Sequence, residues 1–117
     1  MDLSKAVDAH TQWKTKFRVA ISGHQTMDAA TISKDNCCEL GKWLHGEGKS
    51  KCGNLPSHSD CLKKHAAFHV EAGKVAAAIN DKNFTLAESM LNSGTPYASA
   101  SSSVGVAIMQ LKKAAAL

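Results

Sequence analysis

The sequence predicts an all-α protein with a single hydrophobic core. Alanine is abundant while aromatic residues make up only 5% of the chain, a composition that suits thin, closely packed helices better than a β-sandwich. Apolar residues also recur at intervals of three and four, which is the period of a helix. A chain of 117 residues is long enough for one core and too short for a second. We therefore expect one helical domain over residues 1–113.

The first predicted helix begins near Leu3 and ends at Gly23. A three-and-four pattern defines its apolar stripe: Leu3, Ala6, Val7, His10, Trp13, Phe17, Ala20 and Ile21. His10 therefore lies on the face that should turn toward the core. Residues 24–34 keep no such period and are interpreted as a connector, in which residues 27–32 form at most a turn or two.

A short helix that carries a cysteine is predicted next. Asn36 is a candidate N-cap, and Glu39 three residues later completes a capping box, so that Cys38 falls in the first turn. This helix is expected to end near Gly46. Glycines, a proline and two lysines then predict a solvated loop over residues 47–56.

A third helix is predicted to begin at the capping pair Ser57 and Asp60 and to end near Asn80. Its apolar seam consists of Cys61, Leu62, His65, Phe68, His69, Ala72, Val75, Ala76 and Ile79. Both His65 and His69 belong to this seam, so both rings should face the core.

The last helical pattern covers residues 84–113 and contains Pro96. Proline removes a helical hydrogen bond and clashes with the preceding turn, so we predict a kink between residues 92 and 96. The alternative is a break, in which Thr95 caps a new helix and Pro96 takes its first position. The apolar phase continues across the proline, which favours the kink. Residues 114–117 look like a tail added in cloning and are given no role in the fold.

The charge pattern and the cysteines limit the functional classes. The net charge of +4 comes from scattered lysines, with Arg18 as the only arginine, and no basic run is interleaved with aromatic residues. This disfavours nucleic-acid binding. No segment approaches the roughly 20 apolar residues that cross a bilayer, and the N-terminus has no signal-peptide pattern. Four cysteines without a targeting signal favour a reducing compartment over two disulfides. We expect a cytoplasmic protein without membrane insertion.

Four side chains from the predicted helices are candidate metal ligands: His10, Cys38, His65 and His69. His65 and His69 lie about one helical turn apart on one face, close enough to bind a single ion. Three imidazoles and one thiol form the donor set of a closed tetrahedral zinc site. One histidine on an apolar face is usually an ordinary core residue. Burying several uncompensated rings in a small core is costly, however, and a shared zinc ion would satisfy them together.

The adjacent Cys37 competes with Cys38 for the ligand role, and helical phase does not decide between them. A position at a helix N-terminus favours the thiolate, the form that a metal needs. The other two cysteines, Cys52 and Cys61, are expected to be structural. Three further histidines near loops are expected to be solvated: His24, His45 and His58.

Three segments resemble the motifs of the chemoreceptor zinc-binding (CZB) domain. They are residues 8–14 (Asp-Ala-His-Thr-Gln-Trp-Lys), 38–44 (Cys-Glu-Leu-Gly-Lys-Trp-Leu) and 65–69 (His-Ala-Ala-Phe-His), and their order and gaps also match. The resemblance implies a four-helix bundle in which zinc is held by His10, Cys38, His65 and His69. It also selects Cys38 over Cys37. Members of this family serve as cytoplasmic regulatory modules of bacterial chemoreceptors and diguanylate cyclases, and some form dimers.

The function expected from the donors and the resemblance is that of a zinc-binding sensory domain in a bacterial chemotaxis or signalling protein. Its partners would be a linked output domain and a second copy of the chain. The stimulus would be zinc occupancy, oxidation of Cys38 by an oxidant such as hypochlorous acid, or both. A closed zinc site argues against an enzyme. The alternatives are a zinc-stabilised structural dimerisation module, a zinc hydrolase and a di-iron bundle. The two enzyme-like alternatives lack carboxylates beside the histidine motifs at a suitable phase.

Overall fold

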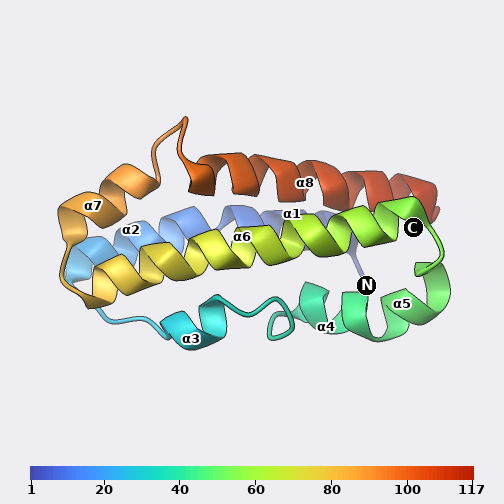
Figure 1. The fold of residues 1–117 in the computed structure, drawn as a ribbon, viewed down its shortest axis with the longest axis horizontal. Coiled ribbons are helices and arrows are strands. Elements are labelled where there is room, and N and C mark those ends of the chain that lie inside the picture. The colour runs from blue at the N-terminus through green and yellow to red at the C-terminus, as the bar shows by residue number, and fades with distance from the viewer.

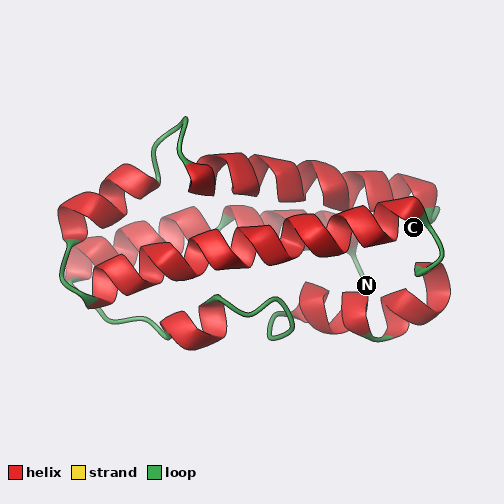
Figure 2. Ribbon diagram, in the orientation of Figure 1, coloured by secondary structure: helices red, strands yellow, loops and turns green.

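Four rods of helix lie side by side along the long axis of the protein (Figure 1), in a computed structural model that describes residues 1–117. The molecule measures 43 × 25 × 19 Å along its principal axes. Helices and connecting loops account for the whole chain, and there is no β-strand (Figure 2). The predicted all-α bundle is therefore confirmed. One of its four rods is assembled from short pieces.

The first rod consists of α1 (Leu3–Thr11) and α2 (Trp13–Gly23). Gln12 between them keeps helical torsion angles, φ −68° and ψ −16°, so the two helices continue each other as the single predicted helix required. The Asp2 side chain accepts a hydrogen bond from the backbone N–H of Lys5 and caps the start of α1. The left-handed residue that ends α2 is His24, with φ 50°, one residue after the expected glycine.

The central rod is α6 (Pro56–Asn80), which packs most extensively against α8 (Pro96–Ala114) and also packs against α2 and α3. Its buried face carries aliphatic and aromatic side chains together with histidines. The largest fully buried apolar side chains of the protein are Phe17, Phe68, Leu3, Leu44, Ile79, Leu91, Ile108 and Leu111. These residues come from all four rods, so a single core holds the bundle together. Proline at the first position starts α6, without the expected Ser57 cap.

The chain breaks before Pro96, between α7 (Phe84–Met90) and α8. Thr95 is extended and its hydroxyl accepts a hydrogen bond from the N–H of Ala98 at 3.2 Å, while Gly94 has a positive φ of 83°. The interruption lies where the sequence predicts it. The structure therefore has the capped break and not a continuous kinked helix. The Thr95 side chain caps the first turn of α8, and Gly94 takes the left-handed backbone that redirects the chain before it.

The fourth rod contains three short helices: α3 (Ala29–Ile32), α4 (Glu39–His45) and α5 (Glu47–Cys52). The loop predicted for residues 47–56 is wrong over its first half, which is α5. Burial explains the difference, because the Cys52 side chain is only 4% exposed and its thiol donates to the Gly48 carbonyl. Packing of this kind overrides the low helix propensity of glycine. The N-cap of α4 is Cys38 and not the predicted Asn36.

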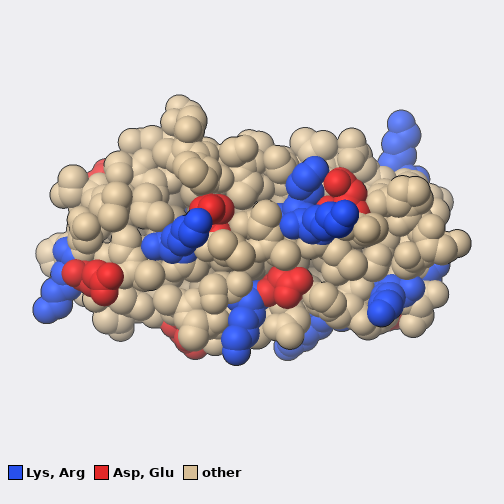
Figure 3. Space-filling view, in the orientation of Figure 1, with Lys and Arg blue, Asp and Glu red and all other residues tan.

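Charged side chains are scattered over the surface in view (Figure 3). Several lysines pair with a carboxylate one turn away, as in Lys64 with Asp60 at 3.2 Å and Lys74 with Glu71 at 2.9 Å. Exposed pairs of this kind contribute little to stability. None of the helices has both the length and the apolar character needed to traverse a lipid bilayer.

Candidate metal centre

All four donors predicted from the sequence meet at one point inside the bundle. His10 comes from α1, His65 and His69 come from successive turns of α6, and Cys38 comes from the start of α4. Their donor atoms all lie within 4.8 Å of one another. The three imidazoles are buried, whereas Cys38 is partly exposed. Residues far apart in the chain thus form a compact cluster of three nitrogens and one sulfur.

Five of the six distances within the cluster lie close to those of a tetrahedral zinc ion, and the sixth, between the donor nitrogens of His10 and His69, is no more than 4.8 Å. The Nε2 atom of His65 lies 3.0 Å from that of His10 and 3.1 Å from that of His69. Cys38 Sγ lies 3.2, 3.6 and 3.9 Å from the Nε2 atoms of His65, His69 and His10, in that order. Ligands at the usual zinc bond lengths form a tetrahedron with edges of about 3.3 Å between nitrogens and about 3.5 Å from sulfur to nitrogen.

Hydrogen bonds to the backbone fix the tautomers of two of the rings. The Nδ1–H of His10 donates to the Ala6 carbonyl at 2.7 Å, and that of His69 donates to the Ile32 carbonyl at 2.8 Å. Because a carbonyl only accepts, Nδ1 carries the proton in both rings and each Nε2 presents a lone pair to the centre. Lone pairs that converge in this way repel one another, unless a proton or a metal cation lies between them.

His65 differs from the other two histidines. Its Nδ1 atom is buried and has no hydrogen-bond partner. Burying a polar nitrogen without a partner is costly, so this ring is held by its packing and by the atoms around its Nε2. It lies at the middle of the cluster, in contact with both other rings.

Burial favours the neutral form of all three imidazoles. It lowers the pKa of His10 and His69, and it lowers the pKa of His65 to about 3, with smaller contributions from the neighbouring histidines. Neutral imidazole is the form that binds a metal. The rings are therefore ready to coordinate at neutral pH without losing protons first.

Cys38 reaches the cluster because it caps α4. Its sulfur accepts a hydrogen bond from the backbone N–H of Gly41 at 3.4 Å. Burial raises the pKa of this thiol in the metal-free protein, and a bound cation would act in the opposite direction by stabilising the thiolate. The neighbouring Cys37 is exposed, with its sulfur 3.5 Å from Asn36 Oδ1. The structure therefore places the sulfur of Cys38, and not that of Cys37, in the cluster.

Comparison with known families agrees with this geometry. The model of the chemoreceptor zinc-binding domain family matches residues 10–76, which is more than half of the chain and spans all four donors. The chain belongs to this family. No curated protein and no solved structure gives a significant match to it. Zinc is accordingly the cofactor of this CZB domain, and the cluster of three histidines and one cysteine fits it.

The histidine rings give the CZB domain a pH dependence. We expect the metal-free protein to lose stability as the pH falls below about 6.5, the pKa of histidine in an unfolded chain. In this range the unfolded chain takes up protons that the folded protein, with its lowered histidine pKa values, does not. The loss should continue toward the pKa of about 3 that burial gives His65.

Urea titrations of the metal-free domain between about pH 7 and pH 5 test this dependence. The midpoint should fall with pH, and the fall should be smaller in the His65→Ala variant. A midpoint that stays constant over this range would contradict the expected burial of neutral rings.

The three histidines outside the cluster have different environments. His58 was expected to be solvated, and this is wrong: it is 2% exposed and its Nε2 lies 2.9 Å from the Leu44 carbonyl. A signal was present, because His58 lies three residues before Cys61 and continues the apolar seam of α6 by one turn. His45 pairs with Asp35 at 2.9 Å, and His24 stacks on Phe84 at a centroid distance of 4.2 Å.

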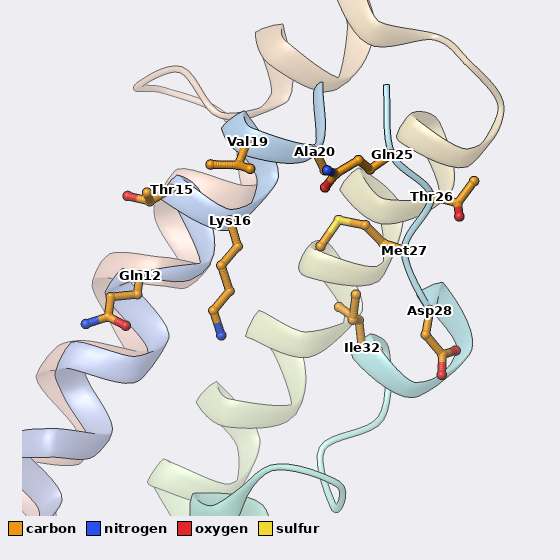
Figure 4. Close-up of a pocket in the computed structure, with 10 residues that line it drawn as sticks. All are labelled: Gln12, Thr15, Lys16, Val19, Ala20, Gln25, Thr26, Met27, Asp28 and Ile32. Atoms are coloured by element: carbon orange, nitrogen blue, oxygen red, sulfur yellow. The ribbon is translucent and has the colours of Figure 1, made fainter. Parts of the chain in front are cut away.

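Two hollows in the surface lie near the metal cluster of this CZB domain. A cavity of about 190 Å³ between α1 and α4 is lined by His10 and Cys38 and leads from solvent to the cluster. A larger groove of about 510 Å³ lies between α2 and α3 (Figure 4). None of its lining residues belongs to the cluster, although Ile32, whose carbonyl orients His69, forms part of its floor.

Proposed function

We propose that this CZB domain is a zinc sensor in which His10, Cys38, His65 and His69 hold one zinc ion. The observation that carries the proposal is the convergence of these four donors at distances that suit tetrahedral zinc. The ion, when bound, supplies a positive charge that stabilises the Cys38 thiolate. In keeping with its family, the domain would regulate an attached output domain of a bacterial chemoreceptor or diguanylate cyclase in the cytoplasm.

The donor set supports a sensory role over hydrolysis. Four protein ligands complete a tetrahedron and leave no position for the water molecule that a zinc hydrolase activates. The carboxylates nearest to the histidine pair in sequence, Asp60 and Glu71, are engaged with Lys64 and Lys74. We therefore propose that the domain is not an enzyme.

The sensory step would be a release of α4. The three imidazoles stand on α1, which α2 continues, and on the 25-residue α6, while the sulfur stands at the start of α4, a helix of only seven residues. Loss of zinc, or oxidation of Cys38, removes the bond that ties this short helix to the long ones. The attached output domain would respond to the resulting change in position of α4.

Homodimerisation is part of the same proposal. Val106 and Met109 on α8 are 57% and 45% exposed, and they line a groove between α1 and α8 together with Gly105. Exposed apolar side chains beside a glycine permit close approach of a second helix. A purely structural dimerisation module, whose association does not depend on the metal, is the second candidate. It predicts that chelation leaves both helicity and association unaltered.

The proposed function is tested by measuring zinc content and oxidant response in a Cys38→Ser variant. The purified wild-type domain should contain one zinc per chain, and the variant should bind zinc much more weakly and lose the response to hypochlorous acid. The neighbouring Cys37→Ser variant is a matched control, which should keep stoichiometric zinc. Unchanged zinc retention and unchanged oxidant response in Cys38→Ser would overturn the proposal.

A further inference from the structure

We propose that Cys37 is the resolving thiol of the metal centre. After a two-electron oxidant has modified Cys38, the sulfur of Cys37 forms a disulfide with it, withdraws it from the zinc site and makes the oxidation reversible by thiols. The inference rests on the proposed zinc and redox role of Cys38. It assigns to the adjacent cysteine a role that zinc binding does not require.

The position of Cys37 suits this role. It is the only exposed cysteine among the four free thiols of the chain. It borders a surface hollow of about 620 Å³, whose far wall includes Ala66 and Val70. These residues directly follow His65 and His69 on α6, so the Cys37 thiol lies at the outer rim of the metal centre.

Small oxidants have a route to Cys38 itself. This residue is only partly buried, and it lines the cavity of about 190 Å³ between α1 and α4. The other two thiols are enclosed, since Cys52 is 4% exposed and Cys61 is 0% exposed. Burial also raises the pKa of the Cys61 thiol to about 12, which keeps it in the unreactive protonated form. Oxidation should therefore be selective for the pair at residues 37 and 38.

The backbone makes zinc ligation and the disulfide mutually exclusive. Cys38 is extended, with φ −81° and ψ 164°. The two side chains point apart, because Cys37 is exposed to solvent while the Cys38 sulfur lies in the cluster. To join the two sulfurs, Cys38 must leave its capping geometry and the metal centre. The segment from Asp35 to Cys38 is not helical, so this rotation does not require a helix to unwind.

The disulfide would also be easy to reduce. Adjacent Cα atoms are about 3.8 Å apart, closer than the roughly 4.4 Å at which unstrained disulfides begin. Strain of this kind raises the reduction potential, which is typical of regulatory disulfides and not of structural ones. Cellular thiols could therefore restore Cys38 and permit zinc to bind again.

The chemistry balances with hypochlorous acid as the oxidant. The Cys38 thiolate attacks the chlorine, a sulfur–chlorine bond forms, and hydroxide leaves. The Cys37 sulfur then attacks the Cys38 sulfur, the sulfur–sulfur bond forms, and chloride leaves. The thiol proton of Cys37 combines with the hydroxide to give water. Each sulfur loses one electron overall, and hypochlorous acid is reduced to chloride and water.

Trypsin separates the two cysteine pairs of this chain, which permits a direct test. Cleavage after Lys34 and Lys42 gives residues 35–42, with Cys37 and Cys38, whereas cleavage after Lys51 and Lys63 gives residues 52–63, with Cys52 and Cys61. The zinc-loaded domain is treated with equimolar hypochlorous acid, free thiols are blocked, and the peptides are weighed. Zinc release is followed in parallel with a coloured chelator.

The wild-type peptide 35–42 should lose two hydrogen atoms as zinc is released, and dithiothreitol should restore both the peptide and zinc binding. The peptide 52–63 should remain unoxidised. Cys37→Ser should bind zinc normally, but its oxidation should add oxygen at Cys38 and should resist dithiothreitol once the sulfinic acid has formed.

Two results would overturn the inference while leaving the proposed function intact. One is zinc release with oxygen added at Cys38 and no disulfide in the wild-type peptide. The other is a disulfide between the Cys37 residues of two chains, which a non-reducing gel reveals. Failure of the oxidant to modify Cys38 at all would instead overturn the proposed redox function.

Discussion

Replacing His69 with alanine is expected to abolish stoichiometric zinc binding and to destabilise the metal-free protein as well. The imidazole is one of four proposed ligands. Losing a group that only hydrogen-bonds a ligand can lower metal affinity by about 100-fold, so losing the ligand itself should lower zinc affinity by at least that much. The ring also donates to the Ile32 carbonyl, which would lose this partner. Leaving a buried carbonyl unpaired costs about 1–3 kcal/mol.

His65→Ala provides the informative comparison. It should lose zinc as severely as His69→Ala, because it removes an equivalent nitrogen. Its metal-free form should be less destabilised, however, because the Nδ1 of His65 has no partner to lose. Metal analysis and urea unfolding of both apo-proteins measure the two effects separately.

His24→Asn is a suitable control for this pair, since it removes an exposed histidine far from the cluster and asparagine tolerates the left-handed backbone at this position. It should keep stoichiometric zinc. Normal zinc content in His69→Ala would contradict the assignment of this residue as a ligand.

Gly41→Ala is expected to displace the turn that carries Cys38 at the start of α4. A Cβ atom at residue 41 would overlap the backbone carbonyl oxygen of Asp35, and backbone atoms cannot turn away as a flexible side chain can. The turn before α4 would have to move, and with it the Cys38 sulfur that Gly41 N–H holds. We expect a loss of about 1–3 kcal/mol in stability and a fall in zinc affinity of at least about 10-fold.

Gly105→Ala is the matched control for this substitution. A Cβ atom at residue 105 meets nothing within 4 Å, and the residue lies inside α8. Alanine there should stabilise the helix of the monomer by up to about 1 kcal/mol and leave zinc binding unchanged, although its methyl group would weaken the proposed dimer contact. Isothermal titration with zinc and thermal unfolding of both variants give the comparison. Equal zinc affinity in Gly41→Ala and wild type would show that the Asp35 turn does not position the sulfur.

The burial of side chains that recur at the helical period could be predicted from the sequence. His10, His65 and His69 lie on apolar stripes, and the same helical phase that builds the core brings them together. The resemblance to the CZB motifs chose Cys38, which helical phase alone could not do. The short α5 was not predictable, because its glycines and lysines favour a loop and only the packing of Cys52 into the core makes it helical.

Backbone groups that support the centre leave no trace in the sequence. The carbonyls of Ala6 and Ile32 orient two of the rings, yet any residue type supplies a carbonyl. The clamp formed by Asn80, whose side-chain amide bonds both the N–H and the carbonyl of Met27, was equally hidden because 53 residues separate the two. This clamp fixes the connector that carries α3 and thereby the Ile32 carbonyl. Contacts between distant segments become visible only after folding.

The nitrogen donors and the sulfur donor stand on helices of different length and packing, which would affect how the domain distinguishes one metal ion from another. Nitrogens carried by α1 and α6 keep their spacing, whereas the sulfur caps α4, a helix of only seven residues that packs less extensively against the other rods. An ion of larger ionic radius than zinc, such as cadmium, needs longer bonds to all four donors. With the nitrogens held in place, it would lie farther from them and displace the Cys38 sulfur outward. The radius of the bound ion would thus set the distance between α4 and the rest of the bundle.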